Sequence, residues 1–150
     1  MSIQPWLLAT HLLGVVAWVG GMLFAVVILR PSLSVLEPPQ RSALHGQLFA
    51  RFFRLVWHAM PLVLLTGYAM LFGVYGGLRH VAWPVHVMHL TGLVMAALFA
   101  FIFFGPWKAM RAATAQGDRP AAASAGDRIR RLVNVNLGLG LLTVAVAAFA

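Results

Sequence analysis

The 150-residue chain is 61% hydrophobic and 9% charged, with a mean hydropathy of +0.87, which excludes an ordinary soluble domain and predicts a single membrane domain over residues 1–150. The net charge of +8 comes from basic residues that flank apolar segments and form no nucleic-acid-binding motif, so we expect contacts with membrane lipid and no nucleic-acid partner. The chain has no cysteine, which excludes disulfides, thiolate metal sites and cysteine nucleophiles.

The first predicted membrane span covers about residues 4–29 and carries no charged side chain. Its one titratable group is His11, and a polar group at membrane depth is costly and typical of a functional site. His11, Trp18 and Met22 are seven and four residues apart, so they share one face of a helix. We expect this face to look into a helix bundle.

A second pattern in the first span is the recurrence of Gly14, Ala17 and Gly21 at spacings of three and four residues. These small residues form a face that lets a neighbouring helix approach closely. We expect the span to be retained as a helix and not cleaved as a signal peptide, because it lacks a basic start and a small-residue cleavage site. Pro31 is expected to end the helix.

Three more spans follow, at about residues 52–74, 84–105 and 132–150. The linker over residues 32–50 is expected to be a loop plus a short helix, and the linker over residues 108–131 a solvated, mobile loop. The sequence therefore predicts an all-α integral membrane four-helix bundle.

The distribution of positive charge predicts the orientation of the bundle. Of the eleven Lys and Arg residues, four lie in or beside the first linker and six in the third, but only one in the second. Cytoplasmic loops carry the excess of positive charge. The bias places both termini on the periplasmic side of a bacterial inner membrane.

This orientation converts sequence position into depth. His11 lies roughly 10 Å from the outer surface, and His86 and His89 lie roughly 4 to 9 Å from it. These three imidazoles are therefore expected in one outer layer. His58 lies roughly 9 Å from the inner surface, in a separate layer.

Imidazoles on different helices of a bundle have two common uses, copper binding and bis-histidine ligation of haem b. The leading hypothesis is copper uptake or delivery, with ligands from His11, His86 and His89 and from Met88 or Met22. The alternative is a haem b-binding redox protein in which His11 faces a histidine of the third span and His58 serves an inner site. Histidine, methionine and backbone groups are the remaining metal donors in a chain without cysteine.

A third hypothesis is an assembly subunit without a cofactor, in which His11 only donates a hydrogen bond to a backbone carbonyl or to Thr91. Acid–base or nucleophilic catalysis has little support, because no carboxylate pair lies within the spans. Enzyme activity stays open, and an enzyme of this kind would be a haem-dependent oxidoreductase. For a transporter, four helices imply a homodimer or a partner such as a periplasmic copper carrier.

The sequence resembles the CopD copper-resistance membrane domain in two places. The order His11-Leu12-Leu13, Ala17-Trp18-Val19-Gly20-Gly21-Met22-Leu23-Phe24 and Leu29-Arg30-Pro31 is similar to that domain's first helix. The order Phe52-Phe53-Arg54-Leu55 and Leu64-Leu65-Thr66-Gly67 is similar to its next helix. The resemblance covers the first half of the chain best, and it implies a copper-handling membrane protein.

A more distant resemblance is to the HemJ protoporphyrinogen oxidase family, small four-helix membrane proteins associated with haem. It rests on His11, Ala17-Trp18, Gly21, Trp83 and Arg131-Leu132-Val133-Asn134. Both families usually have a lysine early in the third helix, where this chain reads Val85-His86-Val87-Met88-His89. Metal-capable side chains in place of the lysine favour a ligand site over protoporphyrinogen oxidation.

Overall fold

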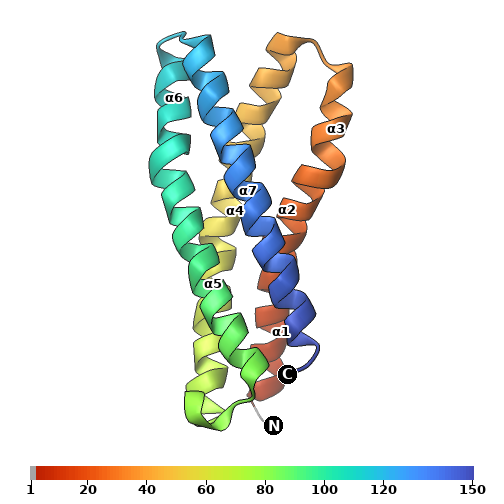
Figure 1. Cartoon of the computed structure of the whole chain (residues 1–150), viewed down its shortest axis with the longest axis vertical. Helices are drawn as coiled ribbons and strands as arrows, with labels where there is room; N and C mark the ends of the chain where they lie inside the picture. The colour runs from red at the N-terminus through yellow and green to blue at the C-terminus, as the bar shows by residue number, and fades with distance from the viewer. Residues whose placement is uncertain (1–2) are drawn as a thin grey trace.

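The computed structural model describes residues 3–150, which form four long antiparallel helices and no strand (Figure 1). All four are long and apolar enough to cross a membrane. The first consists of the consecutive segments α1 (Gln4–Val15), η1 (Val16–Gly20), α2 (Gly21–Leu23), η2 (Phe24–Leu29), α3 (Arg30–Ser32) and η3 (Leu33–Val35). The others are α4 (Pro38–Gly73), then α5 (Trp83–Ile102) with η5 (Phe103–Trp107) and α6 (Lys108–Ala115), and finally α7 (Arg119–Ala147). The predicted all-α membrane bundle is confirmed.

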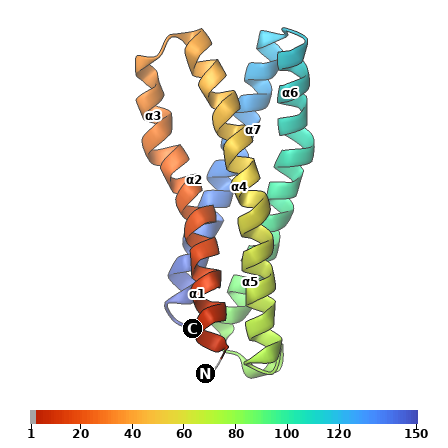
Figure 2. The ribbon, with the colours of Figure 1, turned by 180° about the vertical axis from the view of Figure 1, so that it is seen from behind.

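The two termini lie at the same end of the bundle, beside the turn that joins α4 to α5 (Figures 1 and 2). That turn includes the short 3₁₀ helix η4 (Leu78–His80). The turns that join α3 to α4 and α6 to α7 lie at the opposite end. We call the end with both turns the basic end, because ten of the eleven Lys and Arg residues flank these two turns in the sequence.

The first helix does not end at Pro31, as the sequence predicted, but continues to Val35. Proline removes a backbone donor, and its ring clashes with the carbonyl four residues earlier in a regular α-helix. Here the turns before Pro31 widen into the π-helical segment η2, and η5 likewise contains Pro106. A widened turn makes room for the ring, so the helix passes through both prolines.

The linker over residues 108–131 is also helical, contrary to the expected mobile loop. Only Gln116, Gly117 and Asp118 lie between α6 and α7, and Gly117 takes a φ of 71°. The segment is rich in alanine, the residue with the highest helix propensity. The Asp118 carboxylate accepts a hydrogen bond from the Ala121 N–H at 3.0 Å and caps α7.

The first linker is similarly short, because α4 already begins at Pro38. At the start of α4, the Gln40 side chain accepts a hydrogen bond from the Glu37 N–H at 3.2 Å. Arg41 then reaches back to the end of the first helix, where its guanidinium donates to the carbonyls of Leu33 and Leu36 at 3.1 and 3.0 Å. These bonds tie α4 to the end of the first helix, where the Leu33 carbonyl also accepts the Leu36 N–H at 3.1 Å.

Glycines set the close contacts between helices. A Cβ added to Gly14 would lie 2.6 Å from Cγ2 of Val63, so the backbone of α1 packs directly against a side chain of α4. A Cβ at Gly140 of α7 would lie 3.0 Å from Val19 and 3.1 Å from Met95. The predicted small-residue packing is confirmed at Gly14 and at Gly21, where an added Cβ would lie 3.2 Å from the Phe52 ring.

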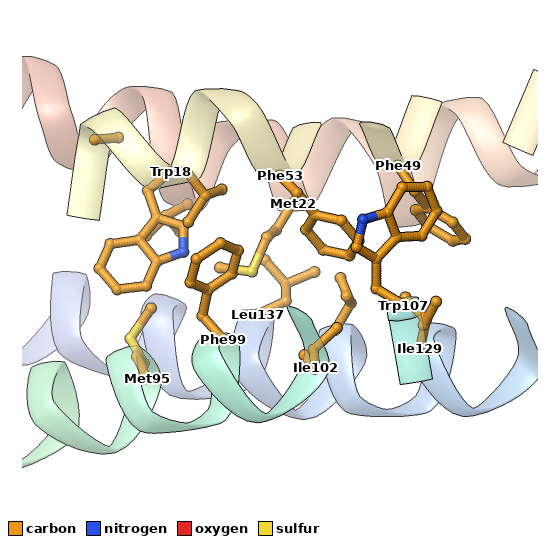
Figure 3. Close-up of a cluster of buried hydrophobic side chains, with 14 residues drawn as sticks. Trp18, Met22, Phe49, Phe53, Met95, Phe99, Ile102, Trp107, Ile129 and Leu137 are labelled. Atoms are coloured by element: carbon orange, nitrogen blue, oxygen red, sulfur yellow. The ribbon is translucent and has the colours of Figure 1, made fainter. Parts of the chain in front are cut away.

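Aromatic rings fill the space between α4 and the third helix. Phe53 packs against Trp107 with ring centroids 5.3 Å apart, and Trp57 packs edge to face against Phe99 at 5.4 Å. Figure 3 shows Phe53, Phe99 and Trp107 beside Met22, Ile102 and Leu137 in one continuous core. Large rings hold these two helices further apart than the glycine contacts hold α1 and α4.

Few polar groups join the helices inside this core. The hydroxyls of Thr91 and Thr143 lie 2.7 Å apart and link α5 to α7. The Asn136 amide donates to the Met95 carbonyl at 3.4 Å. Within residues 3–150, the buried Trp18 Nε1 and Asn136 Oδ1 have no hydrogen-bond partner.

Candidate metal site around His11

His11 lies on α1 and packs against α4, half-buried. Its Nδ1 is 3.0 Å from the Val63 carbonyl oxygen and 3.1 Å from the Thr66 hydroxyl. Further along the same helix face, Trp18 and Met22 are 3% and 1% exposed. The prediction that this face looks into the bundle is therefore confirmed.

The hydrogen bond to Val63 fixes the tautomer of His11. A carbonyl oxygen only accepts hydrogen bonds, so Nδ1 carries the proton and donates it. The neutral ring then presents an unprotonated Nε2 with a free lone pair. In the described part of the chain Nε2 makes no hydrogen bond, and metal-binding histidines commonly have their other nitrogen held by a backbone carbonyl in this way.

Gly67 allows the imidazole ring of His11 to lie against α4. A Cβ added at this position would be 3.3 Å from Cε1 of His11 and 3.6 Å from Nδ1. The adjacent Thr66 is buried, and its hydroxyl bonds to the Leu62 carbonyl at 2.6 Å. Thr66, Gly67 and the Val63 carbonyl thus form a fixed seat that orients the imidazole.

The third helix brings further donors to the same end of the bundle. His89 is half-buried, and its ring meets Tyr68 of α4 edge to face at 5.4 Å. Met88 is also half-buried, whereas His86 is exposed. Tyr68 follows the His11 seat directly in α4, so His11 and His89 contact successive parts of one short segment.

The remaining predicted ligands lie apart from this segment. His58 is exposed and bonds to the carbonyl of Arg54 in its own helix at 2.7 Å. Met22 is buried eleven residues beyond His11, roughly 16 Å along the helix axis. Among residues 3–150, no group of three or more His, Asp or Glu side chains lies close enough to hold a metal ion. The complete ligand set stays a prediction.

The sequence did not identify the α4 seat. Thr91 was the side-chain partner considered for His11, but its hydroxyl pairs with Thr143 instead. In the sequence, the Thr66-Gly67 pair stood out only as part of the segment that resembles the copper-resistance domain. Thr66 follows Pro61 by five residues, and this spacing gave no signal that the pair would face α1, since that depends on the register between the two helices.

The fold defines a multi-pass α-helical membrane protein with a histidine held toward the bundle interior. The family model for copper resistance protein D (CopD) matches residues 46–150, and the chain belongs to this family. The match begins after the first helix, although the resemblance noted in the sequence was strongest there. No curated protein and no solved structure matched the chain.

Proposed function

We propose that this protein binds copper in the bacterial inner membrane and takes part in its uptake or delivery, with His11 as the anchoring ligand. Membership of the copper resistance family supports copper as the cargo. The residue assignment rests on the hydrogen bond from Nδ1 of His11 to the Val63 carbonyl. This bond orients the ring and leaves the lone pair of Nε2 free to bind a metal ion.

Imidazole and thioether groups suit copper, Cu(I) above all. His89 and Met88 are the half-buried candidates on the third helix to complete the site, and His86 is an exposed candidate. Met22 is too far along the first helix to share an ion with His11, so we assign it to a separate, deeper position. In this scheme copper meets the His11 site first and the Met22 thioether afterwards.

The charge distribution supports an orientation for this path. The basic end carries the two turns flanked by Lys and Arg, and the positive-inside rule places such turns in the cytoplasm. His11 then lies toward the periplasm together with both termini. A periplasmic copper carrier could deliver to this end, and a second copy of the chain could complete a passage that one bundle does not enclose.

The experiment is a Cu(I) competition titration of the detergent-purified protein against a chromogenic chelator. Losing the partner that holds a metal-binding histidine typically costs 10–100-fold in affinity, and losing the ligand itself should cost at least as much. We expect His11→Ala to weaken Cu(I) binding by more than tenfold and His89→Ala to weaken it measurably. His58→Ala is the matched control, because His58 is exposed and bonded within its own helix.

The visible spectrum of the same sample separates the alternatives. Equal Cu(I) affinity in His11→Ala and the wild type would refute the ligand assignment. A Soret band that shifts on reduction and is lost in His11→Ala would refute the copper proposal and assign a haem protein. A colourless protein with no Cu(I) affinity would refute both metal functions.

A further inference from the structure

A hollow at the basic end lies between the first helix, α4 and α7. Its basic lining residues are Arg30 of α3, His45 of α4 and Arg130 of α7. Its apolar wall includes Leu33, Phe49 and Val133, all at least nine-tenths buried. The hollow is small, with a volume of about 30 Å³, and it opens to the surface.

The hollow follows from how the helices diverge. Figures 1 and 2 show the ribbons of α3 and α7 separating toward the basic end. Each of the three elements contributes one basic side chain to the space between them. His45, expected from the sequence to be a solvated loop residue, is instead a half-buried residue of α4.

The basic groups are only partly neutralised. Arg130 forms an ion pair with Asp127, one turn earlier on α7, which is itself largely exposed. Among the described residues, no acidic side chain lines the hollow itself, and Arg41 is already engaged with the carbonyls that end the first helix. His45 donates its Nδ1 proton to the Arg41 carbonyl at 3.1 Å, so the neutral ring has only a lone pair at Nε2 and no proton to donate to an anion there. The hydrogen-bond donors of the hollow are therefore the two guanidinium groups, and a single carboxylate is paired with one of them.

We propose that this hollow binds the phosphate group of an anionic phospholipid. Guanidinium groups are well matched to phosphate oxygens, and basic pockets between membrane helices on the cytoplasmic side bind anionic headgroups. The apolar wall favours a lipid over a soluble phosphate, because it continues along Phe49 and Val133 into the membrane-spanning part of the bundle. The bound lipid bridges the first two helices to α7 through Arg30 and Arg130.

The test is thermal unfolding of the full-length protein in a neutral detergent, titrated separately with phosphatidylglycerol, phosphatidylcholine and sodium phosphate. The proposal expects phosphatidylglycerol to raise the unfolding temperature at lower concentration than phosphatidylcholine. A basic residue near the membrane surface contributes about 1 kcal/mol to anionic lipid binding, so Arg30→Gln and Arg130→Gln should each raise the half-saturating concentration roughly fivefold. Arg130→Lys, which keeps the charge, should lose less.

Arg119→Gln is the control, since Arg119 lies at the same end but does not line the hollow. A loss in Arg119→Gln as large as in Arg130→Gln would overturn the site and show a bulk charge effect. Equal stabilisation by both lipids would also overturn it. If sodium phosphate alone reproduced the shift with the same dependence on Arg30 and Arg130, the ligand would be a soluble phosphate and the lipid assignment would be wrong. If Arg130→Gln did not fold, Arg30→Gln and Arg130→Lys would carry the test.

Discussion

Gly14→Ala tests whether the close approach of α1 and α4 is essential to the bundle. The new Cβ would lie 2.6 Å from Cγ2 of Val63 and 3.5 Å from the Ala59 carbonyl oxygen. Carbon atoms pack at about 3.5–4.0 Å, so the helices would have to separate by roughly 1 Å or Val63 would have to turn. Val63 is β-branched and stiff within a helix, and its carbonyl holds His11, so either adjustment disturbs the candidate site.

Gly20→Ala supplies the matched control in the same helix, because a Cβ at Gly20 meets nothing within 4 Å. Replacing Gly by Ala inside a helix gains about 1 kcal/mol in propensity at either position. Overpacking costs about 1–3 kcal/mol and applies only at Gly14. The difference in unfolding free energy between the two variants should therefore be about 1–3 kcal/mol, with Gly14→Ala the less stable.

Thermal unfolding in detergent measures this difference. For a domain of this size each kcal/mol corresponds to roughly 2–4 °C. Gly14→Ala should unfold below Gly20→Ala by at least about 2 °C, and its Cu(I) affinity should fall if Val63 positions His11. Equal unfolding temperatures for the two variants would refute the argument that Gly14 is required by packing.

Three further substitutions test the polar contacts by the same unfolding assay. Thr143→Val removes the hydrogen bond to Thr91 and should lower stability by about 0.6 kcal/mol, and a loss above about 2 kcal/mol would show a larger role than one interhelical bond. Arg41→Ala removes the guanidinium from the carbonyls that end the first helix and should cost about 1.5 kcal/mol, with Arg51→Ala unchanged as its exposed control. Asn136→Leu removes a buried, unpaired Oδ1 together with one long hydrogen bond, so its effect should stay within about 1 kcal/mol, and a severe loss would indicate an internal ligand at that oxygen.

Composition and hydropathy were sufficient to predict the four-helix membrane fold. Apolar segments of this length have few alternatives in a membrane, where every backbone polar group needs an internal partner. The burial of Trp18 and Met22 also followed from helical periodicity. Helix ends were harder to predict, because Pro31 is a strong local signal whose effect is offset by the widened turns before it.

The candidate site was predictable only in part. The position of His11 in an uncharged span identified it, but its partners Val63 and Thr66 are more than fifty residues away. That contact depends on how α1 is rotated and shifted against α4, which Gly14 and Gly67 set by allowing close approach. One sequence carries no direct measure of this register. His58 illustrates the converse, since its depth resembled that of a ligand while its side chain is exposed.

The close approach of Gly140 in α7 to Val19 in the first helix joins two pairs of helices. One pair is the first helix with α4, and the other is the third helix with α7. The chain passes from one pair to the other through Gly76 and Gly77, whose φ values are 75° and 104°. The two pairs pack closely at Gly140 and diverge toward the basic end (Figure 1). A side chain at position 140 would therefore push these two helix pairs apart, because an added Cβ would lie only 3.0 Å from Val19 and 3.1 Å from Met95. The absence of a side chain at Gly140 thus sets the distance between the two halves of the bundle.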